Sequence, residues 1–182
     1  MARKSLSEIL AESNAFFVDN TTGIITPLLL RTWINDLIVA IRPAYGLLRQ
    51  PNAGQTVGTV YEPLVFATGE LSVITDYVLS PNTGSAVRTE AGITVIDFNA
   101  QVTGPNNQDC SVTLFKNGVE MPVSSTARLT GSGEYQTLYI GASLAGTGND
   151  TYQIQVKTTG NLALTFRDCL FLLKSEPAWS IV

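Results

Sequence analysis

The chain has 182 residues, enough for one domain and a short additional segment. Only 14% of the residues are charged and the mean hydropathy is +0.18, so we expect other subunits to cover part of the surface. The formal net charge is −4, and lysine and arginine are scattered apart from a small cluster at Arg3-Lys4. This charge pattern argues against a nucleic-acid partner, which requires a clustered basic face.

No segment has the features of a targeting or membrane-spanning sequence, so we expect no membrane partner. The longest apolar stretch is interrupted by Arg31, Asn35 and Asp36, which are costly at the centre of a bilayer. The N-terminus lacks the apolar core of a signal peptide, and we therefore expect the protein to be made in a cytoplasm. In that compartment Cys110 and Cys169 are expected as buried thiols rather than as a disulfide.

Two helices are predicted near the N-terminus. The capping box Ser5-Leu6-Ser7-Glu8 predicts a short helix over residues 5–15. Thr26 suits an N-cap and Pro27 a first helical position, and the proline at position 43 ends this second helix near Ile41. Its apolar side chains form one wide stripe at spacings of three and four: Leu29, Leu30, Trp33, Ile34, Leu37, Ile38 and Ile41. A lone helix cannot bury this stripe, so it must dock on the rest of the chain, on copies of itself or on a larger partner.

The remaining sequence predicts a linker and then a β-domain. Residues 46–58 are rich in glycine and proline and predict a linker or an irregular loop. Short strand-like segments separated by Gly, Pro, Asn or Ser follow, as is typical of a sandwich or barrel. These segments are 59–67, 70–79, 87–91, 93–102, 111–115, 119–129, 136–140, 151–157 and 162–173.

Within this region, residues 110–128 predict a β-hairpin. Apolar and polar residues alternate on both sides of Asn117-Gly118, which gives each strand one apolar and one polar face. Asn and Gly tolerate the positive φ values that a type I′ turn requires, so we place a tight turn at this pair.

No catalytic motif is recognisable, and we expect no enzymatic activity and no cofactor. The absence of histidine excludes Ser-His-Asp and Cys-His catalysis and most zinc or iron sites. Ser143 lies in a run that superficially resembles a nucleophile elbow, but the spacing is wrong and no base is available. Two alternatives stay open, namely a glycosidase built from dispersed carboxylates and a calcium ion at Asn149-Asp150.

The aromatic residues are spread through the predicted strands, which favours a role in the core or at a subunit interface. We assign six of them to a subunit interface: Phe98, Phe115, Tyr139, Tyr152, Phe166 and Phe171. Tyr135 lies in a loop and is the best candidate for stacking on a sugar. Trp179 belongs to an apolar C-terminal segment that we expect to pack against a neighbour or to remain free.

Residues 92–174 resemble the jelly rolls of the tumour-necrosis-factor and complement-globular-head type, as found in small bacteriophage virion proteins. The resemblance is carried by the segments 93–102, 112–119, 135–140, 144–150, 151–157 and 162–173. The family typically has Gly-Asp where this chain has Asn149-Asp150. The resemblance implies a homotrimer in which aromatic and aliphatic residues of the inner sheets meet at the three-fold axis. It indicates a fold and no particular function.

A second resemblance covers about 20 residues near the N-terminus. Residues 18–31 and the following Asn35-Asp36-Leu37 are similar to a segment near the start of many tailed-phage structural proteins. The resemblance implies that this segment attaches the protein to the particle. The residues that we assign to attachment are Asp19, Asn20, Ile24, Ile25, Leu30, Trp33 and Leu37.

Together these observations predict a mainly β protein. An N-terminal helical attachment segment (1–45) and a linker (46–58) precede an antiparallel jelly-roll β-sandwich (59–182) that forms a trimer. The predicted function is that of a non-enzymatic bacteriophage virion protein, a capsid cement, decoration or head-fibre protein bound to the major capsid protein. The alternative is a receptor-binding protein of the tail fibre or baseplate that recognises a host surface glycan or protein. The position on the virion and the number of copies separate the two.

Overall fold

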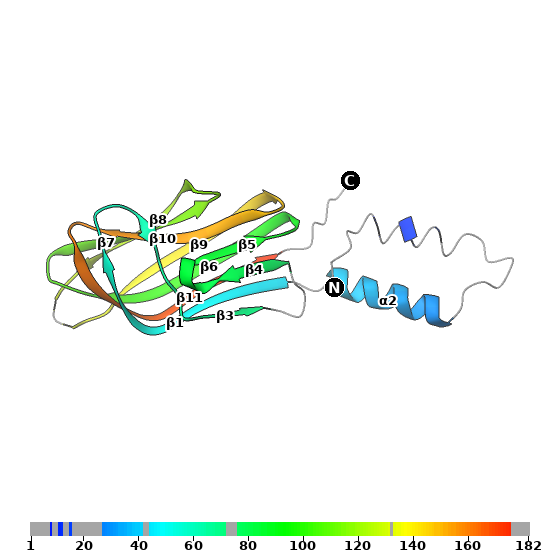
Figure 1. Ribbon diagram of the computed structural model, residues 1–182, viewed down its shortest axis with the longest axis horizontal. Coiled ribbons are helices and arrows are strands. Elements are labelled where there is room, and N and C mark those ends of the chain that lie inside the picture. Colours follow the sequence, from blue (N-terminus) through cyan, green and yellow to red (C-terminus); the bar gives the residue numbers. More distant parts are fainter. Residues whose placement is uncertain are drawn as a thin grey trace.

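The computed structural model describes residues 27–41, 44–71, 76–131 and 133–175, together with Glu8, Ala11, Glu12 and Ala15, which are helical. The helix α2 (Pro27–Ile41) has the bounds predicted from the sequence. Figure 1 shows α2 beyond the end of a β-sandwich, at the end where the first strand begins. The division of the chain into an N-terminal attachment segment and a head stays a prediction.

The sandwich consists of two antiparallel sheets. One sheet has the strand order β3-β1-β11-β6-β9, and the other has the order β4-β5-β10-β7-β8, with β2 beside β10. The strands are β1 (Ala44–Val57), β2 (Glu62–Pro63), β3 (Thr68–Leu71), β4 (Tyr77–Ser80), β5 (Ser85–Arg88), β6 (Ala91–Thr103), β7 (Gln108–Lys116), β8 (Val119–Leu129), β9 (Gln136–Thr147), β10 (Asp150–Thr158) and β11 (Leu162–Ser175), with a 3-10 turn η1 (Pro81–Thr83) after β4.

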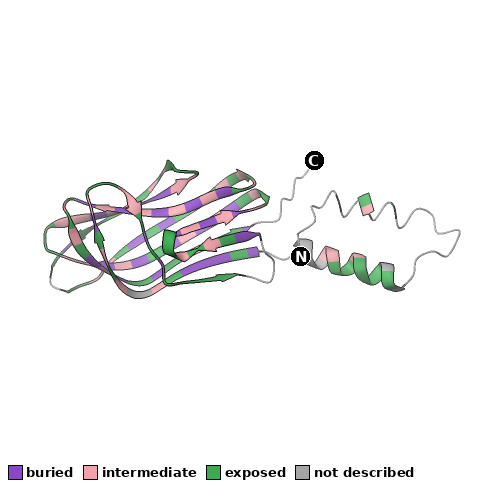
Figure 2. Cartoon of the chain, in the orientation of Figure 1, coloured by how far each residue is buried: buried purple, intermediate pink, exposed green. Residues whose placement is uncertain are grey.

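The core lies between the two sheets and follows from alternation along the strands. On β10, Tyr152, Ile154 and Val156 are buried and alternate with partly exposed polar residues, and Figure 2 shows the same alternation on the neighbouring strands. Cys110 and Cys169 are buried, free thiols, as predicted. Burial raises the pKa of each thiol to about 12, which keeps both protonated at neutral pH.

The prediction of a linker over residues 46–58 is wrong. This stretch belongs to β1, which pairs with β11 from Ala44 to Val57 and therefore lies inside the sheet. Gly46 marks a close contact rather than a loop, because a Cβ atom there would lie 2.9 Å from Cδ2 of Leu79. Pro51 is tolerated because it faces the irregularity in β11 at Asp168, whose φ is 53°. The β-domain therefore begins at Ala44 rather than at residue 59.

Two further strand predictions need correction. Of the expected strand 59–67, only Glu62–Pro63 pairs with another strand. The expected strand 70–79 is two strands, β3 and β4, which lie in different sheets. Both errors arise where the chain crosses from one sheet to the other, and hydrophobic alternation does not report such a crossing.

The hairpin prediction is confirmed. β7 and β8 are joined by Asn117 and Gly118, whose φ values of 53° and 77° are those of the primed turn that the Asn-Gly pair predicted. A second tight turn, with positive φ at Gly148 and Asn149, joins β9 to β10. β9 extends to Thr147 and β10 begins at Asp150, so this turn consists of Gly148 and Asn149.

Candidate subunit interface

The outward side of the five-stranded sheet carries large apolar side chains, whereas the solvent-facing side of an antiparallel sheet is usually polar. We call this side the outer face and define it by its apolar residues, Tyr45, Leu47, Ile93, Val95, Tyr139, Leu170 and Leu172. They occupy the positions on β1, β6, β9 and β11 that alternate with the core residues. The four strands are neighbours in the sheet, and polar residues stand between some of the apolar ones: Lys174 between Tyr45 and Val95, and Asn99 between Leu170 and Tyr139.

Several of these side chains are substantially open to solvent. Tyr45 and Ile93 are each 41% exposed, and Leu170 and Tyr139 are 40% and 54% exposed. Leu47 is only 9% exposed although it lies outside the core cluster, and it stands opposite Leu172 in the sheet register. An apolar centre surrounded by half-exposed large side chains is the pattern expected of a protein interface.

Charged groups on the outer face are paired with one another. The Nζ of Lys174 lies 3.9 Å from Oδ2 of Asp97, and the hydroxyl of Tyr139 donates a hydrogen bond of 3.2 Å to Oδ1 of the same carboxylate. This hydrogen bond and the charge of Asp97 raise the pKa of Tyr139. At the edge of the sheet, Arg49 and Glu70 approach to 3.8 Å. These exposed contacts add little stability, but they limit the charge that a partner would have to desolvate.

The outward side of the six-stranded sheet is different. Along β10 it presents polar residues such as Gln153, Gln155 and Lys157. The chain itself covers part of this side through Tyr61, whose ring meets that of Phe115 edge-on at 5.7 Å and lies 4.1 Å from the Nζ of Lys157. The hydroxyl of Thr113 donates a 2.7 Å hydrogen bond to the Tyr61 oxygen. The outer face of the five-stranded sheet is therefore the better candidate for a subunit interface.

Four of the six aromatic residues assigned to the interface are core residues. Phe98, Tyr152, Phe166 and Phe171 point between the sheets and are at most 1% exposed, so a second subunit cannot reach them. The sequence showed that these residues lie on strands but not which side of the sheet they face. Phe115 lies on the six-stranded sheet beneath Tyr61, and among the six only Tyr139 lies on the outer face.

The outer-face residues that sequence reasoning missed had two recognisable signals. Tyr45 ends the stretch that was interpreted as the attachment segment, and Leu47 lies in the stretch that was interpreted as a linker. Leu170–Leu173 is an uninterrupted apolar run, which is typical of a strand buried on both sides, and the alternating residues Leu170 and Leu172 supply its second apolar side.

The residues assigned to particle attachment fall into two groups. Asp19, Asn20, Ile24 and Ile25 lie outside the described residues. Leu30, Trp33 and Leu37 lie on α2, where Leu30 is 40% exposed and the other two are half-buried. Leu28 and Ile34, on the same helix, are 69% and 41% exposed. The apolar stripe of α2 is thus at least partly open, and its role in attachment stays a prediction.

The chemistry at Asp150 does not favour the calcium alternative. Its buried carboxylate accepts hydrogen bonds from the Asn117 amide at 2.7 Å and the Thr147 N–H at 2.9 Å, and Nζ of Lys116 lies 3.3 Å away. Burial alone would raise the pKa of this carboxyl, but the three donors outweigh it and lower the pKa. Within the described ranges no group of three metal-ligating side chains occurs, and no helix is long and apolar enough to cross a membrane.

Solved structures of similar architecture identify the fold. The globular domain of zebrafish complement 1qA is 18% identical with a TM-score of 0.53, covering 72% of this chain and 95% of that one. The Eiger TNF of S. frugiperda is 10% identical with a TM-score of 0.54, covering 74% of this chain and 93% of that one. No protein-family model and no curated protein sequence matches this chain. The likeness confirms the expected fold: the head is an antiparallel jelly-roll sandwich of the C1q and TNF type.

Proposed function

We propose that the chain forms a homotrimer through the outer face of its five-stranded sheet. The observation that carries this proposal is the exposure of four large side chains on the outer face, which the protomer leaves open by 40% or more: Tyr45, Ile93, Tyr139 and Leu170. Head domains of the C1q and TNF type are typically homotrimers, which supports the same state for this chain. A three-fold axis lets one patch on each protomer serve all subunit contacts and closes the assembly.

We further propose that the trimer is a non-enzymatic structural protein of a bacteriophage virion, made in the host cytoplasm. The N-terminal segment would attach it to the major capsid protein, and the heads would project outward as a cement, decoration or head-fibre protein. Two observations support this proposal: the resemblance carried by residues 18–31, and the exposure of Leu28, Leu30 and Ile34 on α2. Attachment of many copies would stabilise a capsid by mass action, without any chemistry.

The experiment removes the N-terminal segment at the boundary that the structure defines. A chain that begins at residue 44 keeps all of β1 and should form the same trimer as the full chain, measured by light scattering. Added to capsids that lack the protein, the full chain should bind in many copies, and the shortened chain should not bind. Binding of the shortened head would exclude attachment through the N-terminal segment, and a monomeric head would exclude the trimer.

The alternative function is receptor binding at the tail fibre or baseplate, with the same trimer. The observation in its favour is Tyr135, whose ring lies 5.0 Å from the Arg167 guanidinium and thus combines an aromatic surface with several hydrogen-bond donors. Such a pair suits a host surface glycan. A few copies at the tail, and glycan binding that Tyr135→Ala abolishes, would favour this function, whereas labelling over the whole capsid would favour the first.

A further inference from the structure

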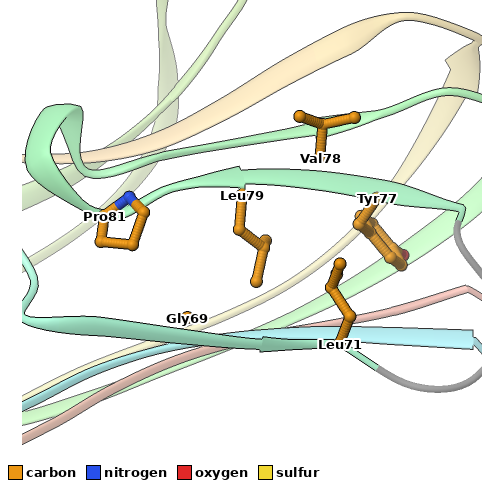
Figure 3. A pocket seen from close by; sticks show the side chains of 6 residues that line it. All are labelled: Gly69, Leu71, Tyr77, Val78, Leu79 and Pro81. Atoms are coloured by element: carbon orange, nitrogen blue, oxygen red, sulfur yellow. The ribbon is translucent and has the colours of Figure 1, made fainter.

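The apolar groove between β3 and β4 offers no reactive group. Figure 3 shows Leu71, Tyr77 and Leu79 directed into the space between these two strands. Among the described residues that line the groove, only Tyr77 has an ionisable side chain, and burial raises its pKa to about 12, so the phenol stays protonated at neutral pH. The β7–β8 turn, in contrast, contains a pair of residues that can react with each other.

Asn117-Gly118 is the only Asn-Gly pair in the chain. In such a pair the glycine nitrogen can attack Cγ of the asparagine side chain, because glycine has no side chain to hinder the approach. A succinimide forms and ammonia leaves, and water then opens the ring to aspartate or isoaspartate. The reaction needs no enzyme, cofactor or oxidant. Gly118 is exposed, and a Cβ atom built there would meet no atom within 4 Å, so the surrounding described residues do not shield it.

The fold holds the Asn117 side chain by both of its polar atoms. Its amide nitrogen donates a 2.7 Å hydrogen bond to Oδ1 of Asp150, and its amide oxygen accepts a 2.8 Å hydrogen bond from the Thr151 N–H. We call these two hydrogen bonds the clasp. The nitrogen that Asp150 holds is the atom that must leave as ammonia, and ring closure turns Cγ towards Gly118. The reaction therefore cannot proceed while the clasp is intact.

Deamidation would also destroy the clasp, because it places a second carboxylate against Asp150. The Asp150 oxygen lies 2.7 Å from the nitrogen that would be replaced, and Asp150 is only 4% exposed, so water screens the repulsion poorly. Lys116, 3.3 Å from Oδ2 of Asp150, balances one negative charge only. Arg88 stands opposite Asp150 in the sheet register, but its guanidinium donates to the Thr94 hydroxyl at 2.9 Å.

We propose that Asn117 is a site of spontaneous deamidation, which the clasp keeps unreactive in the folded head. Its conversion to aspartate or isoaspartate unlocks the β7–β8 turn from β10. The change is covalent, so refolding does not reverse it. All the groups involved belong to one protomer, and the inference therefore stands apart from the proposed trimer and from attachment to a particle.

Mass spectrometry measures the rate of deamidation at Asn117, with the urea-unfolded chain as the reference. In the folded natural chain the rate should be lower by about tenfold or more, because the reaction requires local opening. Asp150→Ala should raise the folded rate several-fold. The matched control is Ile154→Val, a buried position on the same strand, which lowers stability but leaves the clasp in place and should change the rate little.

Two outcomes of this experiment would overturn the proposal. Equal rates in the folded and the unfolded natural chain would show that the fold does not protect Asn117. Equal acceleration by Asp150→Ala and Ile154→Val would show that the overall stability of the head, rather than the clasp, sets the rate.

The variant Asn117→Asp tests the effect of the product. Aspartate tolerates the left-handed conformation much as asparagine does, so the change isolates the charge, and it should lower the urea midpoint. Adding Asp150→Asn exchanges the amide and the carboxylate and should recover part of this loss. The matched control is Asn107→Asp, at another exposed asparagine with positive φ, which should leave the midpoint nearly unchanged. An unchanged midpoint for Asn117→Asp, or a double variant no more stable than Asn117→Asp alone, would overturn the unlocking.

Discussion

The side-chain amide of Asn117 donates a hydrogen bond of 2.7 Å to Oδ1 of Asp150, which joins the β7–β8 turn to the start of β10. The amide oxygen of Asn117 accepts a 2.8 Å hydrogen bond from the N–H of Thr151, and the Asn117 N–H donates to the Thr151 carbonyl. Asn117 therefore serves two purposes: it tolerates the left-handed conformation of the turn, and it locks that turn onto the next hairpin.

The first prediction concerns Asp150→Ala. This change removes the acceptor of Asn117, Thr147 and Lys116 and leaves donors without a partner at a buried position, which should lower the free energy of unfolding by about 1–3 kcal/mol. The measurement is urea unfolding at a fixed chain concentration. The control is Asp109→Ala, which breaks the exposed 2.9 Å pair with Arg128 and should cost less than about 1 kcal/mol. Equal losses in the two variants would contradict the role assigned to Asp150.

The second prediction is a loss of stability in acid that depends on Asp150. Its pKa in the folded chain lies below the ordinary value of 3.8, so the unfolded chain binds this proton more readily. The contribution of Asp150 to stability is therefore fully present above about pH 4 and is lost as the pH falls through the folded pKa. The free energy of unfolding, measured from pH 6 down to pH 2, should fall less steeply with decreasing pH for Asp150→Asn than for the natural chain. An identical slope would contradict the prediction.

The limits of sequence-based prediction are clear at particular elements. α2, the Asn117-Gly118 turn and β8 were predicted with their observed bounds, because each depends on local signals: a proline at the helix start, a tight turn and alternation. β1 was missed because its glycine and proline are explained only by distant contacts, Gly46 beneath Leu79 and Pro51 opposite Asp168.

The candidate interface shows the same limit. The sequence placed Phe98 and Tyr139 on strands, but these residues face opposite sides of one sheet, where they occupy neighbouring strands. Which side meets the second sheet is decided by the packing of the whole sandwich. The sequence of a single strand contains this information only when one side of the strand is clearly polar. Both sides of β11 are apolar along the run 170–173, so its sequence does not show which side faces the core.

The third prediction concerns the outer face. Leu170→Asp places a charge on the outer face, where burial between subunits would be costly, and should convert the trimer to monomers in light scattering. The fold should survive, because Leu170 is 40% exposed in the protomer. The control is Val119→Asp, at a more exposed apolar residue in the β7–β8 hairpin, which should leave the trimer intact. If the Leu170→Asp variant remained a trimer and dissociated into monomers at the same protein concentration as the natural chain, the outer face would be excluded as the interface.

The fourth prediction separates the two possible starts of the β-domain. A chain that begins at residue 44 keeps β1 and should unfold cooperatively, with a stability close to that of the full chain. A chain that begins at residue 59 lacks β1. Without β1, β11 loses its pairing partner on one side and β3 loses its pairing partner in the sheet. The core residues Phe171 and Leu173 on β11 would then be exposed to solvent. That chain should be insoluble or should lose its cooperative transition in circular dichroism. If both chains unfolded at the same midpoint in circular dichroism, β1 would be dispensable. The boundary at residue 59 that was predicted from the sequence would then describe the domain better than the one at Ala44.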